Sequence, residues 1–138
     1  MSRWTVEADG GSRGNPGPAG SGTVVIDDTG TVVAAFGKWL GITTNNVAEY
    51  TAMLDGVTWV FDHDPDAEVE VVMDSKLVVE QMSGRWKVKH PSMRALYTAA
   101  LGVIAGRSVL FRWVPRFENS RADAIANLVM DSGEDVTA

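Results

Sequence analysis

The sequence predicts an α/β protein with a mixed five-stranded sheet flanked by helices, in the order βββαβααβα. Three strand-like segments joined by short turns open the chain, which is typical of an antiparallel meander. Two further strand-like segments follow, and helical patterns precede and follow each of them. Strands separated by helices need crossover connections, so we expect the last two strands to run parallel to the first.

The opening strands are predicted from alternating apolar residues and from β-branched residues. We expect them at residues 3–9, 22–26 and 31–39. The glycine- and proline-rich residues 10–18 predict a turn that ends the first strand. Residues 27–30 predict a second turn.

The later elements follow the helical and strand periods in turn. Ser75 is expected to cap a short helix, Gly106 to end a longer one, and Pro115 to end the last strand. Asn119 or Ser120 should cap the final helix. The expected helices cover residues 47–61, 76–82, 92–105 and a segment from about residue 120, and the expected strands cover residues 69–74 and 109–114.

Length and composition indicate one globular domain. The chain has 138 residues, 45% hydrophobic and 22% charged. We assign residues 1–131 to this domain and residues 132–138 to an acidic flexible tail or truncated linker. Apolar runs stay short of the ~20 residues that a membrane span needs, the start lacks a signal-peptide pattern, and the sequence contains no cysteine. We therefore predict a cytoplasmic protein without thiolate metal sites.

The net charge of −6 is unevenly distributed. Residues 1–75 carry −9, residues 76–121 carry +7 and residues 122–138 carry −4. A basic segment in an acidic chain can form a phosphate-binding face, although it can also be a solvated surface without further function.

Four acidic residues are candidates for a shared site. Asp9 and Asp74 each end a predicted strand, and those ends lie ~5 Å apart if the two strands are neighbours. Ligands of open α/β sheets bind at this edge. Glu49 and Asp123 fall in the first turns of helices that should pack on the sheet. Each acid has a structural alternative, a turn for Asp9 and helix capping for the others.

Taken together, the four acids predict metal chemistry. Four carboxylates in one pocket repel one another unless a cation compensates. Oxygen ligands without Cys or His favour Mg²⁺ or Mn²⁺. Two such ions ~3.5–4 Å apart can hold the attacking water and the leaving oxygen of a phosphodiester. The inferred reaction is metal-dependent phosphodiester hydrolysis.

Four segments of the chain resemble, in order, those of bacterial type 1 ribonuclease H. They are residues 9–18, 43–49, 73–75 and 119–123. The resemblance implies an RNase H-like fold and an endoribonuclease that cuts the RNA strand of RNA–DNA hybrids, leaving 3′-hydroxyl and 5′-phosphate ends. Some relatives are the N-terminal domain of a longer bifunctional protein that continues into a phosphatase-like domain.

The resemblance also implies roles for single residues. Asp9, Glu49, Asp74 and Asp123 match four metal-binding catalytic acids of the family. Asp9 would bridge two Mg²⁺ (or Mn²⁺) ions, with Glu49 and Asp74 completing one site and Asp123 the other. Glu49 in this family also faces a ribose 2′-hydroxyl, the group that distinguishes RNA from DNA. The implied substrate-binding residues are Gly10, Ser12, Asn15, Thr44, Asn45, Asn46, Lys76, Trp86 and Arg116.

Some of these positions have alternatives or depart from the family. Asn45 and Asn46 can cap a helix, and Trp86 can pack in the core, as we also expect for Trp113. Lys76 stands where relatives often carry an amide. Many relatives have a histidine before the last helix; here Arg116 is nearest. An arginine side chain stays charged and cannot shuttle protons at neutral pH, so we expect Arg116 to hold the scissile phosphate or aid product release.

Two other functions stay open at this point. The chain can be another nuclease or strand transferase with the RNase H-like fold, since such enzymes also use clustered acids. It can also be a hybrid-binding module without catalysis. Our leading hypothesis is a monomeric ribonuclease H whose partner is an RNA–DNA hybrid and not a membrane.

Overall fold

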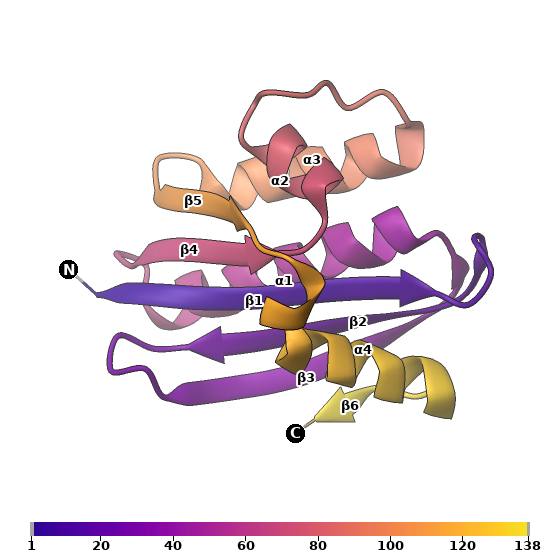
Figure 1. Cartoon of the computed structure of the whole chain (residues 1–138). Coiled ribbons are helices and arrows are strands. Elements are labelled where there is room, and N and C mark those ends of the chain that lie inside the picture. Colours follow the sequence, from indigo (N-terminus) through magenta and orange to yellow (C-terminus); the bar gives the residue numbers. More distant parts are fainter. Residues whose placement is uncertain (1, 138) are drawn as a thin grey trace.

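The computed structural model describes residues 2–137. Over these residues a mixed sheet with the strand order β5-β4-β1-β2-β3-β6 is flanked by helices (Figure 1). In chain order the elements are β1 (Arg3–Ser12), β2 (Gly17–Ile26), β3 (Val32–Thr43), α1 (Asn45–His63), β4 (Glu68–Met73), α2 (Lys76–Met82), α3 (Pro91–Ile104), β5 (Ser108–Trp113), the 3₁₀ helix η1 (Arg116–Glu118), α4 (Ser120–Ser132) and β6 (Val136–Thr137).

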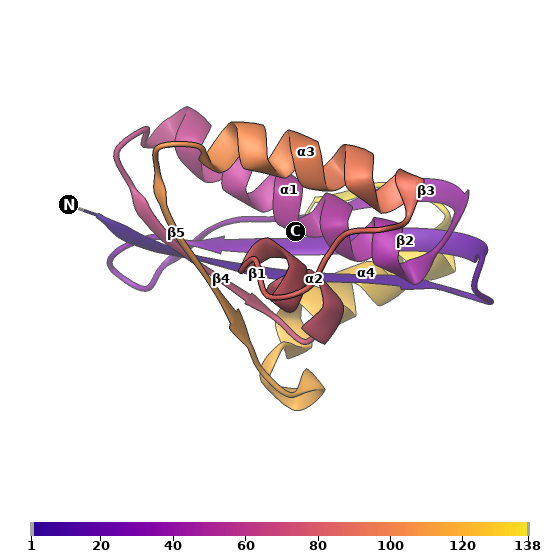
Figure 2. The same cartoon turned by 90° about the horizontal axis from the view of Figure 1, so that it is seen from above.

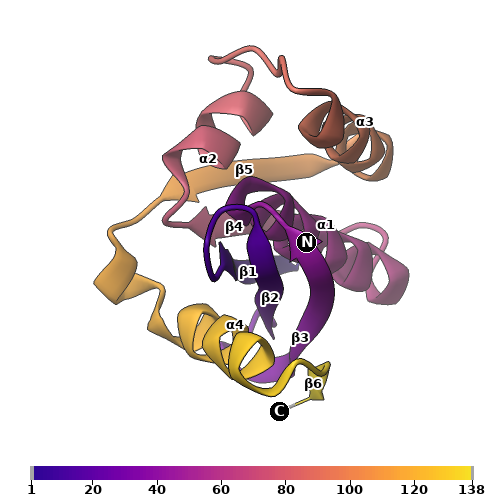
Figure 3. The same cartoon turned by 90° about the vertical axis from the view of Figure 1, so that its right-hand side faces the viewer.

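The predicted fold class and strand directions are confirmed. β1, β2 and β3 form an antiparallel meander. β4 pairs parallel with β1, and β5 pairs parallel with β4. Helices α1 and α3 cover one face of the sheet and α4 covers the other (Figures 2 and 3). Within residues 2–137, no helix combines the length and the apolar character needed to cross a membrane.

The predicted turn over residues 10–18 is largely wrong. β1 continues to Ser12 and β2 already begins at Gly17, so that only the four residues between them turn. Gly10 and Gly11 do not break the strand, because they allow close packing against Ala48 and Met130, whereas Gly14, with a φ of 80°, lies in the turn itself. Since β2 starts early, β3 finds partners beyond its predicted end at Trp39 and runs on to Thr43.

Part of the segment predicted as a tail lies in regular elements, since α4 includes Ser132 and β6 covers Val136–Thr137. Gly133, with a left-handed φ of 68°, ends α4 and turns the chain back. β6 then pairs antiparallel with β3 and adds a sixth strand to the predicted five. The Asp135 carboxylate also accepts a hydrogen bond of 2.7 Å from the backbone N–H of Trp39. Met1 and Ala138, at the outer ends of the predicted domain and tail, lie outside the described residues.

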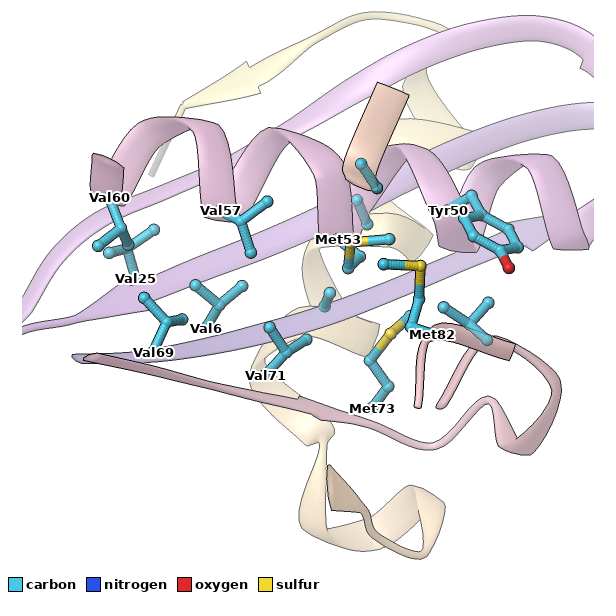
Figure 4. Close-up of a cluster of buried hydrophobic side chains, with 14 of the residues drawn as sticks. Val6, Val25, Tyr50, Met53, Val57, Val60, Val69, Val71, Met73 and Met82 are labelled. Carbon is cyan, nitrogen blue, oxygen red and sulfur yellow. The ribbon is translucent and has the colours of Figure 1, made fainter. Parts of the chain in front are cut away.

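The main hydrophobic core lies between α1 and the sheet (Figure 4). The side chains of Met53 and Val57 on α1 are fully buried above Val6 of β1 and Val71 of β4. Burying such side chains stabilises the fold by about 1.5–3 kcal/mol each. This packing holds α1 against β1, which carries Asp9, and against β4, which Asp74 follows.

Two glycine contacts bring the helices close to Asp9. A Cβ added to Gly10, the next residue of β1, would overlap the backbone of Ala48 in α1. A Cβ added to Gly22, which pairs with Asp9 across the sheet, would overlap the backbone of Ala122 in α4. Ala48 and Ala122 each precede a candidate acid, so these contacts bring Glu49 and Asp123 toward Asp9.

The mutation Gly10→Ala should therefore damage both stability and the site. We expect the free energy of unfolding to fall by about 1–3 kcal/mol, because the new methyl group forces α1 away from β1. The matched control is Gly102→Ala in α3, where an added Cβ meets nothing within 4 Å. It should stabilise the protein by up to about 1 kcal/mol. Urea unfolding of both variants checks this, and wild-type stability in Gly10→Ala would contradict the packing.

Candidate active site

The structure brings the four predicted acids to one region of the sheet, each from a different element. The prediction that Asp9 ends the first strand is wrong, because Asp9 lies inside β1. Asp74 directly follows β4. The parallel pairing of Glu7 with Val72 places the two acids at matching positions. Glu49 lies near the start of α1, and Asp123 lies in the first turn of α4.

The electrostatics of Asp9 show how close these acids are. The Asp9 residue is only 4% exposed. Burial, followed by the negative charge of Asp74, a hydrogen bond and charge from Asp123 and the charge of Glu49, raises the pKa of Asp9 from 3.8 to about 8. Without a cation, Asp9 therefore keeps its proton at neutral pH.

The pKa of Glu49 is raised for a related reason. Burial is the largest cause, and it raises the pKa of Glu49 to about 7. A hydrogen bond with Ser75 and the charge of Arg116 act against this rise, while Asp74 adds to it. Two of the four acids thus become harder to ionise in the folded chain.

Positive and polar groups hold the other two carboxylates. The Arg116 guanidinium lies 3.9 Å (Nε) from Oδ2 of Asp74 and 3.6 Å (Nη2) from Oδ1 of Asp123. The amide of Asn119 donates to Oδ1 of Asp74 at 3.0 Å. The amide of Asn127, one turn after Asp123, donates to Oδ2 of Asp123 at 3.3 Å. Sequence reasoning missed both amide contacts. The contact of Asn119 depends on how α4 packs, whereas Asn127 stands four residues after Asp123 in the same helix, a spacing that helical geometry could have identified.

The capping alternatives have different outcomes. Ser75 does cap α2, because its hydroxyl accepts the Val78 N–H at 3.2 Å. α1 is capped by Thr44, whose hydroxyl accepts the Val47 N–H at 3.3 Å. Glu49 then lies too far into the helix to act as a capping-box acid, so this alternative is wrong.

The prediction that Asn119 caps the last helix is wrong for its side chain. Asn119 occupies the N-cap position of α4, but its side chain makes no capping hydrogen bond. It turns toward β1 and Asp74 instead. Asp123, in the first turn of the same helix, is near the positive end of the helix dipole.

The donor chemistry of the site suits a hard divalent cation. It offers four carboxylates, and burial together with the negative charges of its neighbours raises the pKa of Asp9. Within residues 2–137, however, no three His, Cys, Asp or Glu side chains converge closely enough to form a ready-made metal cage. Ligation of metal by the four acids therefore stays a prediction.

The predicted substrate-binding residues of the first loop and of α1 lie together. The side chain of Asn15 accepts the Asn45 N–H at 3.1 Å, and that of Asn45 accepts the Asn46 N–H at 3.0 Å. The Ser12 hydroxyl donates to the Thr43 carbonyl at 2.8 Å and also lies 2.6 Å from the Gly14 carbonyl, so it is used within the protein. These contacts tie the β1–β2 loop to the N-terminus of α1.

The remaining predicted substrate-binding residues lie in different surroundings, and so do the two tryptophans for which core packing is an expectation. Gly10 is buried beneath α1. Trp86 is 47% exposed, so core packing is wrong for it; it lines a surface cavity of ≈ 590 Å³ with Lys87, Arg94 and Tyr97. Trp113, also expected in the core, is 46% exposed. Its indole N–H donates to the Asp74 carbonyl at 3.1 Å, and Lys76 Nζ lies 5.7 Å from its ring centre.

Comparison with known proteins adds an independent line of support. The family model described as "Reverse transcriptase-like" matches residues 7–129. The chain is 51% identical over 129 residues to the bifunctional protein Rv2228c of Mycobacterium tuberculosis, covering 92% of this chain and 35% of that protein. It is 40% identical over 124 residues to ribonuclease HI of Halobacterium salinarum, covering 89% of this chain and 62% of that protein. The chain thus spans about a third of the length of Rv2228c.

Solved structures agree with these matches. The N-terminal RNase H domain of Rv2228c has a TM-score of 0.91 at 48% identity, covering 96% of each chain. The structure of LC11-RNase H1 in complex with an RNA/DNA hybrid has a TM-score of 0.87 at 37% identity, covering 96% of this chain and 99% of that one.

Proposed function

The chain belongs to the ribonuclease H family, and on that premise we propose that it is a metal-dependent endoribonuclease for RNA–DNA hybrids. It cuts the RNA strand and leaves 3′-hydroxyl and 5′-phosphate ends. The observation that carries this proposal is the buried Asp9, which lies among three other carboxylates and whose pKa rises to about 8 through burial first and then through the influence of Asp74, Asp123 and Glu49. A binding module without catalysis has no need of such a costly cluster.

Asp9, Glu49, Asp74 and Asp123 would hold two Mg²⁺ or Mn²⁺ ions, with Asp9 shared between them. When bound, such ions activate the attacking water and stabilise the leaving oxygen. The chain's own residues prepare the site for them. Burial and repulsion raise the proton affinity of Asp9, so the proton must leave as positive charge arrives.

Exposed and partly exposed side chains around the site provide the hybrid contacts. Asn15, Asn45 and Asn46 offer donors and acceptors to the shallow groove, and LC11-RNase H1, which shares this fold, binds an RNA/DNA hybrid. Thr44 is the N-cap of α1, the helix that carries Glu49, and Lys76 is the first residue of α2, two residues after Asp74. The basic cavity at Trp86 suits a DNA-strand phosphate backbone.

Arg116 has a geometry that suits phosphate binding. Its side chain is 76% exposed while its guanidinium approaches both Asp74 and Asp123. It can therefore leave these carboxylates to a cation and hold the scissile phosphate.

Gly10 and Ser12 act through the shape of the strand and loop that carry Asn15. A cytoplasmic location and a monomeric state stay predictions.

A side-by-side cleavage assay tests the proposed function. Labelled RNA–DNA hybrid, double-stranded RNA and duplex DNA are each incubated with the protein and Mg²⁺. We expect cleavage of the RNA strand of the hybrid alone, and none when the metal is chelated. Equal cutting of duplex DNA would instead favour another nuclease of this fold. Hybrid binding without any cleavage would favour a binding module.

A further inference from the structure

A single buried asparagine connects most of the candidate active site. Asn119 is fully buried. Its amide Nδ2 donates to Oδ1 of Asp74 at 3.0 Å and to the carbonyl of Ala8, the residue before Asp9, at 2.9 Å. The backbone carbonyl of Asn119 accepts the backbone N–H of Asp123 at 3.1 Å. Three of the four acids are thus tied to one residue.

The orientation of this amide is fixed by its surroundings. Both groups that face Nδ2 are oxygen acceptors, so turning the amide over would set Oδ1 against two oxygens. In its present orientation Oδ1 is buried and finds no hydrogen-bond partner among the described residues. In the folded chain, Nδ2 therefore makes two hydrogen bonds while Oδ1 stays buried and unpaired.

A purely structural explanation does not account for these contacts. An asparagine that caps a helix presents its oxygen to an N–H of the first turn. Asn119 stands at that position of α4 without making such a bond. An apolar residue would fill a buried space without leaving an unpaired oxygen. What this position requires is a donor that reaches both the backbone of β1 and the Asp74 carboxylate.

We propose that Asn119 is a positioning residue for the Asp74 carboxylate. It fixes the rotamer of Asp74 and anchors it to β1, so that Asp74 and Asp9 face a divalent cation in one arrangement. It also sets the first turn of α4, which carries Asp123, in register with them. This inference rests on the proposed function, because it gives Asn119 a role only where the four acids bind metal.

Two substitutions at Asn119 and one matched control test the proposal. N119D keeps the size of the side chain and replaces its donor by an acceptor, and N119A removes both. The control is Q81L, because Gln81 is another buried amide with two hydrogen bonds, from the Tyr50 hydroxyl at 2.6 Å and to the Lys87 carbonyl at 3.1 Å. For each protein we measure Mg²⁺ affinity by calorimetry without nucleic acid, thermal stability, and kcat and KM on the hybrid.

We expect both Asn119 variants to bind Mg²⁺ about 10- to 100-fold more weakly than the wild type. Their kcat should fall while KM for the hybrid stays the same, since Asn119 is buried away from the substrate. Q81L should lose thermal stability but keep wild-type Mg²⁺ affinity. Should N119A fail to fold, N119D carries the comparison. In the wild type, the side-chain amide NMR signal of Asn119 should also shift as Mg²⁺ is added.

Wild-type Mg²⁺ affinity in the Asn119 variants would overturn the proposal, as would an equal loss of affinity in Q81L or an Asn119 signal that ignores Mg²⁺. A wild-type protein that binds no Mg²⁺ and cuts no hybrid would overturn the proposed function as well. An active wild type with unaffected Asn119 variants would overturn this inference alone.

Discussion

Replacing Asp9 by asparagine should lower cleavage of the RNA–DNA hybrid at least about 1,000-fold. Metal ions stabilise transition-state charge by several kcal/mol, and each 1.36 kcal/mol corresponds to a factor of ten in rate. Asp9 is the carboxylate that the other three surround, so its loss should weaken both predicted metal positions at once. Steady-state cleavage at saturating Mg²⁺ measures the effect.

The same variant should be more stable than the wild type when metal is absent. The substitution Asp9→Asn removes a group that must take up a proton in order to be buried beside three other acids, an uptake that costs folding free energy at neutral pH. The matched control is Asp62→Asn, an exposed acid toward the other end of α1, which should change neither activity nor stability. Retained activity in Asp9→Asn, or loss of its fold, would show that Asp9 serves structure rather than catalysis.

The metal-free protein should lose stability as the pH rises from about 4 to about 8. The pKa of Asp9 is near 3.8 when the chain is unfolded and about 8 when it is folded. Between these values the folded state binds more protons than the unfolded state, so raising the pH favours unfolding, by up to about 1.4 kcal/mol per pH unit for one such group. Glu49 acts in the same direction up to its folded pKa of about 7.

Other shifted acids do not interfere with this window. Hydrogen bonds from Thr29 and Arg85 lower the pKa values of Asp27 and Glu80. Their contribution is complete above the ordinary values of 3.8 and 4.5 and is lost only at lower pH. The decline toward pH 8 should therefore report on the active-site cluster.

Urea unfolding with a chelator, at several pH values between about 5 and 8, measures this decline. Asp9→Asn should flatten it. Saturating Mg²⁺ should remove most of it, because a bound cation takes the place of the proton and stabilises the folded state. A wild-type stability that stays constant over this range without metal would contradict the raised pKa of Asp9.

The sheet topology could be predicted because its elements carry strong periodic patterns. Alternation in the opening strands and the three-and-four spacing up to Phe61 are local signals that tertiary packing did not override. The ends of β1 and β2 could not be predicted, because Gly10 and Gly17 look like turn residues until a helix or a loop is known to pack on them. β6 is too short to show any period.

The four acids could be predicted as a set from the chain, but the groups that hold them could not. Asn119 looks like a helix cap in the sequence, and only the packing of α4 against β1 reveals its bonds to Ala8 and Asp74. Arg116 likewise meets its two carboxylates only in the folded chain, whereas Asn127 reaches Asp123 within one turn of α4. Motif spacing predicts the candidate residues, while the fold determines how they are held.

Diffraction from a crystal grown with Mn²⁺, recorded for the anomalous signal of manganese, tests the central claim most directly. We expect two anomalous peaks in contact with Asp9, one shared with Glu49 and Asp74 and the other with Asp123. Peaks confined to other surface acids, or no peak among these four carboxylates, would contradict the claim that they form a divalent-metal site.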